Sequence, residues 1–219
     1  MSLAKIIKLK SGNFNLPITN YLIRLVNDGK KINYIFLTGG KSLLKVYKKL
    51  FNEIKKKNFK IKIFLTDERC KQKGDKNLNE RLFQDVNNFF LPIIKRNYSF
   101  SQCAYFYNKI VPSKPKFILL SIGEDGHIAS IFSKSEAIFS KKKVIYMKKK
   151  YKKFSRITVT LKYLIDKKNI ILFCKNNSRK KILFKCLKNS KHVLHKLVKY
   201  NTNIILFFNK NYYKVLIKG

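Results

Sequence analysis

The sequence predicts an α/β fold in which a mainly parallel β-sheet carries helices on both of its faces. Short apolar runs alternate with stretches of helical spacing along most of the chain, and this alternation is typical of parallel sheets with helical crossovers. Polar segments also follow three of the apolar runs directly, at 38–42, 66–69 and 121–127. The 219 residues suit one large domain or two small ones. Because the sequence has no long linker and no internal repeat, we expect a single domain over residues 1–219.

The individual elements follow from hydrophobic spacing. Residues 33–37 form a continuous apolar run before a Gly-Gly turn, which predicts a buried strand. Residues 42–56 place Leu43, Val46, Tyr47 and Leu50 on one face, which predicts an amphipathic helix. Similar patterns predict further strands at 60–66, 116–122, 143–147, 156–160, 169–174, 203–208 and 212–217. They predict further helices at 16–27, 77–90, 177–189 and near 191–199.

The formal net charge of +39 has two interpretations. Lysine and arginine release counterions from phosphates, so the charge is compatible with nucleic-acid binding. However, 44 of the 50 cationic residues are lysines, and they are spread along the whole chain beside abundant Asn, Ile, Phe and Tyr. These five residue types have AT-rich codons, so an AT-rich genome produces this composition without selection for a partner. We therefore expect no specific nucleic-acid partner.

The cysteine pattern and the hydropathy favour a cytoplasmic protein. Cys70, Cys103, Cys174 and Cys186 form no CxxC pair, and their spacing fits neither a zinc site nor a disulfide framework. Free cysteines are typical of a reducing compartment. No apolar run reaches the length of a membrane span, and residues 1–10 lack the apolar core of a signal peptide. We expect no membrane partner and either a monomer or a homodimer.

The first polar segment is Thr38-Gly39-Gly40-Lys41-Ser42, between a predicted strand and a predicted helix. Two glycines allow a ligand to approach the backbone closely, and a helix N-terminus attracts anions. The phosphate-binding P-loop motif would need a glycine at position 35, which is isoleucine, so that motif is excluded.

The second polar segment is Thr66-Asp67-Glu68-Arg69, at the end of the strand predicted at 60–66. Adjacent charges in this position are either a helix-cap cluster or the polar wall of a site, and the sequence alone leaves both open. Since the carboxyl ends of parallel strands share one edge of the sheet, this segment and the other two are expected to form one ligand site.

The third polar segment, Gly123-Glu124-Asp125-Gly126-His127, carries the strongest chemical signal. A histidine can serve as a general base near neutral pH, and the carboxylate of Asp125, two residues away, is available to orient its ring. The other reading of this segment is a loop histidine that caps a helix. His192 and His195 are spaced i, i+3, a spacing that can bind metal, but no third ligand is near them and we interpret them as structural.

Together the segments resemble the 6-phosphogluconolactonase family, which belongs with the glucosamine-6-phosphate isomerases and deaminases. The family's Gly-x-Gly-x-Asp-Gly-His-x-Ala-Ser-Leu-Phe-Pro signature is similar to residues 121–133. Its Ser-Gly-Gly-Ser-Thr-Pro loop is similar to 38–43. Its Asp-Glu-Arg strand end is similar to residues 67–69. The Ser-Asn-Tyr segment that follows in the family is similar to Lys76-Asn77-Leu78. Its Arg-Ile-Thr-Leu-Thr strand and Gly-x-x-Lys helix start are similar to 156–160 and 177–180.

The resemblance implies a Rossmann-like fold and the hydrolysis of 6-phosphogluconolactone without a metal or cofactor. His127 would activate water, and Asp125 would help to set its imidazole. The remaining roles concern binding of the sugar phosphate. The phosphate would be held by Gly39, Gly40, Lys41, Ser42, Arg156 and Lys180. The sugar pocket would be lined by Asp67, Arg69 and Asn77.

The chain departs from the family pattern at several positions. The first glycine of the signature is Ser121 and its closing proline is Ser133, while Asn177 replaces the glycine before Lys180. The deaminase branch, which we keep as an alternative, typically follows its histidine with Phe-Asn-Glu-Pro. The matching stretch here, 130–133, contains no acid, so the sequence favours the lactonase branch.

Overall fold

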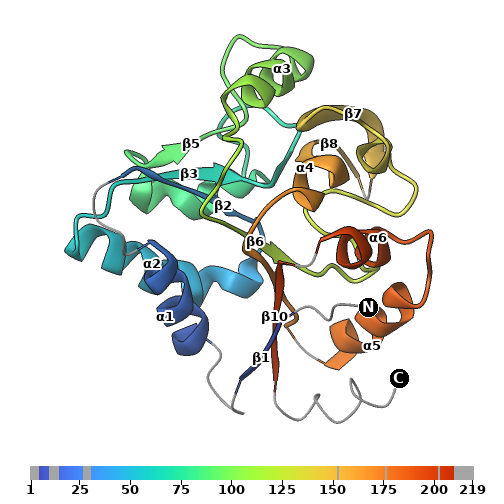
Figure 1. The fold of residues 1–219 in the computed structure, drawn as a ribbon. Helices are drawn as coiled ribbons and strands as arrows, with labels where there is room; N and C mark the ends of the chain where they lie inside the picture. Colours follow the sequence, from blue (N-terminus) through green and yellow to red (C-terminus); the bar gives the residue numbers. More distant parts are fainter. Residues whose placement is uncertain are drawn as a thin grey trace.

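The structure is a computed structural model that describes residues 5–9, 15–26, 31–151, 153–175, 177–201 and 203–209. Its main sheet has seven strands in the order β1-β10-β9-β6-β2-β3-β5, and every neighbouring pair is parallel (Figure 1). The strands are β1 (Lys5–Leu9), β2 (Asn33–Leu37), β3 (Ile61–Leu65), β5 (Phe90–Leu91), β6 (Phe117–Ser121), β9 (Ile170–Phe173) and β10 (Ile204–Asn209). The predicted fold class is therefore confirmed.

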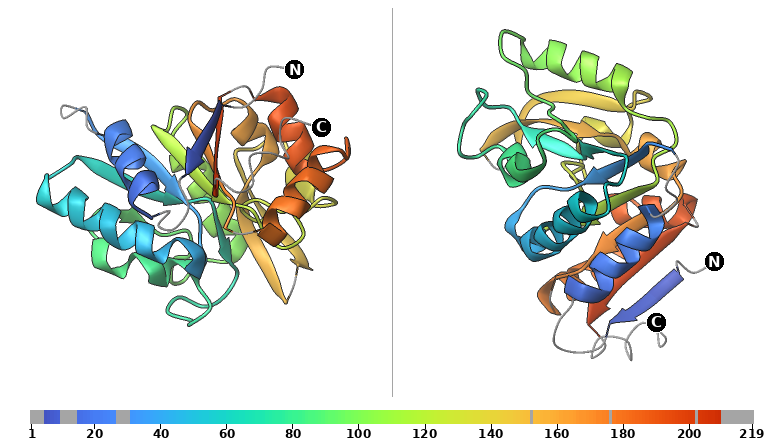
Figure 2. Two further views of the ribbon diagram at one scale, coloured as in Figure 1. Left: turned by 90° about the horizontal axis from the view of Figure 1, so that it is seen from below. Right: turned by 90° about the vertical axis from the view of Figure 1, so that its left-hand side faces the viewer.

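Helices cover both faces of this sheet (Figures 1 and 2). On one face, α1 (Asn15–Val26) and α2 (Leu44–Lys56) lie side by side, and α1 contacts β10 through the ring pair Tyr21–Phe207. On the opposite face, α4 (Leu161–Ile165) contacts β2 through the ring pair Tyr163–Phe36. The remaining helices are α3 (Phe100–Ile110), α5 (Asn177–Leu187) and α6 (Val193–Tyr200). Their buried side chains join those of the sheet in one continuous hydrophobic core.

The structure also has a second, three-stranded antiparallel sheet. It has the order β4-β8-β7, with β4 (Asp67–Arg69), β7 (Val144–Tyr151) and β8 (Phe154–Val159). The strands predicted at 143–147 and 156–160 thus lie outside the parallel sheet. The connection between β7 and β8 is too short for a parallel crossover, so the two strands must pair as an antiparallel hairpin. β7 contains both buried and exposed residues, whereas β9 is buried throughout.

The helix predicted at 77–90 is also different in the structure. A 3₁₀ helix, η2, spans Asn79–Val86, and the short strand β5 follows it. Its buried residues are Asn79, Glu80, Phe83 and Val86, and the last three recur with the three-residue period of a 3₁₀ helix. Two further 3₁₀ helices are η1 (Lys41–Leu43) and η3 (Glu136–Ile138).

The sequence interpretation did not identify β1, β4, β5, α3 or α4. α3 begins with a complete capping box, in which Ser99 accepts from the Gln102 N–H and the Gln102 side chain accepts from the Ser99 N–H. The strand predicted at 212–217 lies outside the described residues. In the part of the chain that the structure describes, no helix is long and apolar enough to cross a membrane.

Candidate active site

The three polar segments converge on one cavity at the carboxyl edge of the main sheet. β6, β2 and β3 are consecutive strands, so the residues that follow them meet at one edge. The cavity has a volume of about 410 Å³. Its walls include Thr38, Gly39, Gly40, Ser42, Asp67, Arg69, Asn79, Gly123, Glu124, His127, Ser130, Phe132, Arg156, Lys175 and Arg179.

The Gly-Gly loop after β2 brings backbone to the cavity wall. Gly40 has φ of +101°, a left-handed conformation that favours glycine. Gly39 is needed for a different reason, because a Cβ there would lie 2.1 Å from Cγ of Asn79. η1 and α2 begin at this loop, and Leu43 at the start of α2 makes no side-chain capping bond. The arrangement offers backbone N–H groups and a helix N-terminus to an anion.

Asp67 is a buried carboxylate that ties three segments together. Its Oδ2 accepts a 2.6 Å hydrogen bond from Oγ of Ser130, and its Oδ1 accepts from the Thr66 hydroxyl at 3.1 Å. The Ser130 N–H donates to Oγ1 of Thr158, which lies opposite Asp67 in the pairing of β4 with β8. The loop after His127 is therefore fixed to the second sheet beside the cavity.

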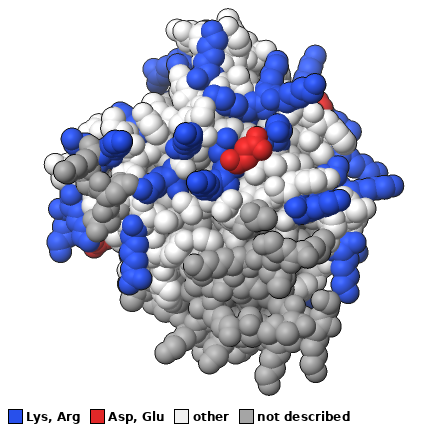
Figure 3. Space-filling view, in the orientation of Figure 1, with Lys and Arg blue, Asp and Glu red and all other residues white. Residues whose placement is uncertain are grey.

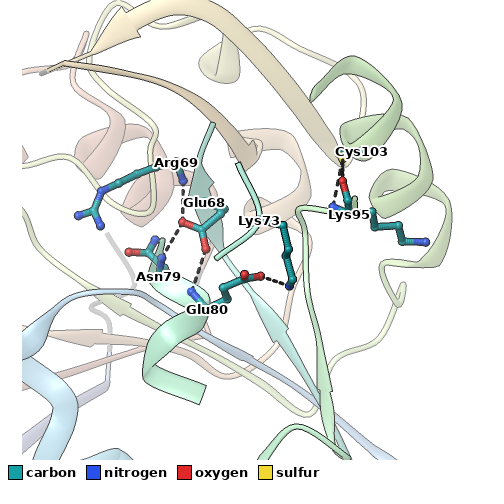
Figure 4. Close-up of polar contacts among 7 residues, drawn as sticks. All are labelled: Glu68, Arg69, Lys73, Asn79, Glu80, Lys95 and Cys103. Carbon is teal, nitrogen blue, oxygen red and sulfur yellow. Dashed lines mark hydrogen bonds and ion pairs between the residues drawn. The ribbon is translucent and has the colours of Figure 1, made fainter. Parts of the chain in front are cut away.

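Glu68 has the role of a helix cap, so both interpretations of the 66–69 segment apply. Its side chain is fully buried, does not line the cavity, and points toward the start of η2 (Figure 4). Oε1 accepts from the N–H groups of Arg69 and Asn79, both at 2.7 Å, and Oε2 accepts from the Glu80 N–H at 2.9 Å. Burial raises the pKa of Glu68 to about 8, although these three donors act in the opposite direction.

These bonds place Asn79 in the wall of the cavity. Its Nδ2 donates to the Asp67 carbonyl at 3.0 Å. Asn77, the residue predicted for this position, lies outside the cavity: its side chain donates to Asp75, and its carbonyl accepts a hydrogen bond from Arg69. The two asparagines are two residues apart, and the chain turn before η2 decides which one reaches the site.

Cationic side chains dominate one part of the cavity wall. Arg69 and Arg156 lie opposite each other in the β4–β8 pairing, and both contact the Phe154 ring. Arg156 is only 8% exposed, and burial lowers the pKa of its guanidinium. Among the described residues, Nε of each of these two arginines has no hydrogen-bond partner. Guanidinium groups held in this way are suited to bind a phosphate or carboxylate.

Two further cations reach the cavity from the segment after β9. They are Lys175, which is exposed, and Arg179, whose guanidinium donates to Glu124 at 2.8 Å. The prediction named Lys180, the next residue along α5. The side chains of Lys180 and Lys41 lie outside the described residues, although α5 and η1 themselves are described. The sequence signal for Arg179 was its position at the start of a helix that follows a buried strand.

His127 lies on the rim of the cavity with one ring nitrogen engaged. Nδ1 contacts Oδ1 of Asp125, and the imidazole packs against the Phe132 ring with centroids 4.7 Å apart. A Cβ at Gly123 would lie 2.2 Å from Cε1 of this ring, so the close approach requires glycine. An Nδ1–H that donates to the carboxylate leaves Nε2 as the proton acceptor, which is the form a general base needs.

The structure therefore brings most of the predicted residues to one place. Gly39, Gly40, Ser42, Asp67, Arg69, His127 and Arg156 line the cavity, and Asp125 supports His127 from behind. Side chains that the sequence interpretation missed are Asn79, Glu124, Ser130, Phe132, Lys175 and Arg179. In the described ranges, no group of three His, Cys, Asp or Glu side chains could hold a metal ion. On the face in Figure 3, Lys and Arg are spread widely and are not gathered in one patch.

Comparisons with known proteins agree with this arrangement. Residues 18–203 match the family described as glucosamine-6-phosphate isomerases/6-phosphogluconolactonase. A probable 6-phosphogluconolactonase of Dictyostelium discoideum is 26% identical over 201 residues, covering 82% of this chain and 85% of that protein. The 6-phosphogluconolactonase of Borreliella burgdorferi is 28% identical, with 83% and 86% covered. The crystal structure of the Thermotoga maritima 6-phosphogluconolactonase superposes with a TM-score of 0.80 at 19% identity, covering 94% and 99%.

Proposed function

Because this chain belongs to the glucosamine-6-phosphate isomerase/6-phosphogluconolactonase family, we propose that it hydrolyses 6-phospho-D-glucono-1,5-lactone to 6-phosphogluconate. This reaction belongs to the oxidative part of the pentose phosphate pathway. The observation that carries the proposal is the His127–Asp125 pair at a cavity that is also lined by Arg69, Arg156, Lys175 and Arg179.

We assign the chemical step to His127. Its Nε2 removes a proton from a water molecule while the water oxygen attacks the C1 carbonyl carbon of the lactone. The tetrahedral intermediate then collapses, and the bond between C1 and the ring oxygen breaks. The leaving oxygen takes its proton from the imidazolium of His127. The carboxylate of Asp125 faces Nδ1 and holds the imidazole in this orientation.

The cationic wall supplies the binding energy that orients the lactone. Arg156 and Arg179, with Lys175 and the Gly39-Gly40 backbone, would hold the phosphate dianion by charge-assisted hydrogen bonds. We include Lys41 and Lys180 in this anchor on the family resemblance. Because the phosphate is remote from C1, anchoring it can orient the lactone without blocking the reacting carbon. The attack on the anchored lactone is then effectively intramolecular. We assign recognition of the sugar hydroxyl groups to Asp67, Arg69 and Asn79, which line the same cavity.

The experiment is to add purified protein to freshly made 6-phosphogluconolactone and to record acid release. Acceleration over the spontaneous opening is the expected result. A parallel sample with glucosamine 6-phosphate measures ammonia release, which we expect to be absent because residues 130–133 contain no acid. Ammonia release without lactone hydrolysis would replace the proposal with the deaminase reaction, and neither activity in folded protein would refute both.

A further inference from the structure

A second histidine lies behind the turn that carries His127. The turn at 123–127 separates the substrate cavity from a smaller one of about 270 Å³, because Glu124 lines both and Asp125 lines the smaller one. The far side of the smaller cavity is formed by α5 and the start of α6, and includes Cys186 and His192. The turn is a thin wall that depends on contacts from this side for its position.

The hydrogen bond at Nδ1 decides the protonation of His192. Its side chain is the N-cap of α6, with Nδ1 accepting from the Leu194 N–H at 3.2 Å. A neutral imidazole that accepts at Nδ1 carries its proton on Nε2. The ring is only 6% exposed, and burial lowers the pKa of His192. The ring is therefore neutral near pH 7, with a single N–H whose direction is fixed by the cap.

The Nε2 edge of this ring faces the turn, and among the described residues Nε2 has no hydrogen-bond partner. A Cβ at Gly126 would lie 3.0 Å from Nε2 of His192 and 2.5 Å from Sγ of Cys186, so both side chains touch the Gly126 backbone. The Asp125 carbonyl is close enough to raise the pKa of His192, in opposition to burial. Gly126 also has φ of +83°, and its N–H donates to the Gly123 carbonyl at 3.2 Å.

We propose that His192 is a positioning residue for the catalytic turn: it caps α6 through Nδ1, and the Nε2 edge of its ring supports the Asp125-Gly126 peptide by direct contact. This role rests on the function proposed above. The imidazole couples the end of α6 to the residue pair that orients His127, without touching substrate. Displacement of a reacting group by about 1 Å can cost on the order of a hundredfold in rate, so loss of this support reaches the chemical step.

The test uses His192→Asn, with His195→Gln as a matched control. Asparagine is a good N-cap, so the variant keeps α6 capped, but its side chain is too short to reach the turn. His195 lies one turn further along α6 and contacts the Leu187 carbonyl instead. We expect His192→Asn to unfold at nearly the wild-type temperature, to lose roughly tenfold in kcat, and to keep KM. His195→Gln should keep both constants.

Nitrogen NMR of the wild-type imidazoles, without substrate, tests the same point independently of activity. We expect His192 in the Nε2–H form and a shifted Gly126 amide signal in His192→Asn only. An Nδ1–H form, an unshifted Gly126 amide, or a wild-type kcat in His192→Asn would each overturn the positioning role. If wild-type protein does not hydrolyse the lactone, the proposed function fails, and the tautomer and the Gly126 signal still decide this inference.

Discussion

The hydroxyl of Ser130 donates a 2.6 Å hydrogen bond to Oδ2 of Asp67, joining residues 63 positions apart in the sequence. Both side chains are almost fully buried. This contact fixes the loop after His127 to the strand end that carries Arg69. It therefore couples the proposed catalytic turn to the proposed binding wall.

Ser130→Ala should destabilise the fold by about 1.5–3 kcal/mol, because a buried carboxylate loses a charge-assisted hydrogen bond. Urea unfolding with constant slope measures the change. Ser135→Ala is the matched control: Ser135 is fully buried, and among the described residues its hydroxyl has no hydrogen-bond partner. Ser135→Ala should be neutral or stabilising. If Ser130→Ala and Ser135→Ala lower the free energy of unfolding equally, the hydrogen bond to Asp67 does not stabilise the fold.

Glu68→Gln should change how stability depends on pH. Burial raises the pKa of folded Glu68 to about 8, above its ordinary value of 4.5. Between these values the folded chain holds one proton more than the unfolded chain, so the Glu68 contribution to stability falls as pH rises, with a slope approaching ~1.4 kcal/mol per pH unit. Glutamine does not titrate, so the variant should lack this slope.

Unfolding free energies at pH 5, 6.5 and 8 measure this difference between wild type and Glu68→Gln. The surface residue Glu53, paired with Lys57, provides the control Glu53→Gln, which should keep the wild-type slope. A parallel pH dependence of wild type and Glu68→Gln would show that the raised pKa of Glu68 is not a property of the folded protein.

Arg156→Met should weaken substrate binding more than it slows chemistry. The variant removes a charge-assisted contact to the phosphate worth about 1.5–3 kcal/mol, so KM should rise at least tenfold while kcat changes little. The product 6-phosphogluconate should also raise the unfolding temperature of the wild type more than that of the variant. Arg81, which is exposed on η2, provides the control Arg81→Met. Wild-type KM in Arg156→Met would remove Arg156 from the phosphate anchor.

The sequence predicted the parallel sheet well because its strands are buried on both faces. Such strands read as continuous apolar runs, and the run at 33–37 coincides with β2. The strands at 143–147 and 156–160 were predicted, but their pairing in a second sheet was not, because β7 and β8 are also rich in β-forming residues. What distinguishes them is a short hairpin connection, and spacing alone did not reveal that they leave the main sheet.

The site was predicted at the level of segments, and less well at the level of single residues. The sequence locates the ends of its strands well. It therefore predicted Gly39 and His127, which follow β2 and β6, and Arg156, which lies in β8. Asn79 was missed because its place depends on the bonds from Glu68 that start η2, which are contacts between distant residues. Arg179 was missed because successive side chains of a helix point about 100° apart, and the sequence did not show that this position of α5 reaches the cavity.

The central claim is that His127 activates water for lactone hydrolysis. The measurement compares the wild type with His127→Ala and with the control His195→Ala on fresh 6-phosphogluconolactone at slightly acidic pH, where we expect spontaneous opening to be slower. His127→Ala should fold normally and lose about 10²–10⁴-fold in kcat, while His195→Ala should keep the wild-type rate. A folded His127→Ala with wild-type kcat would contradict the mechanism.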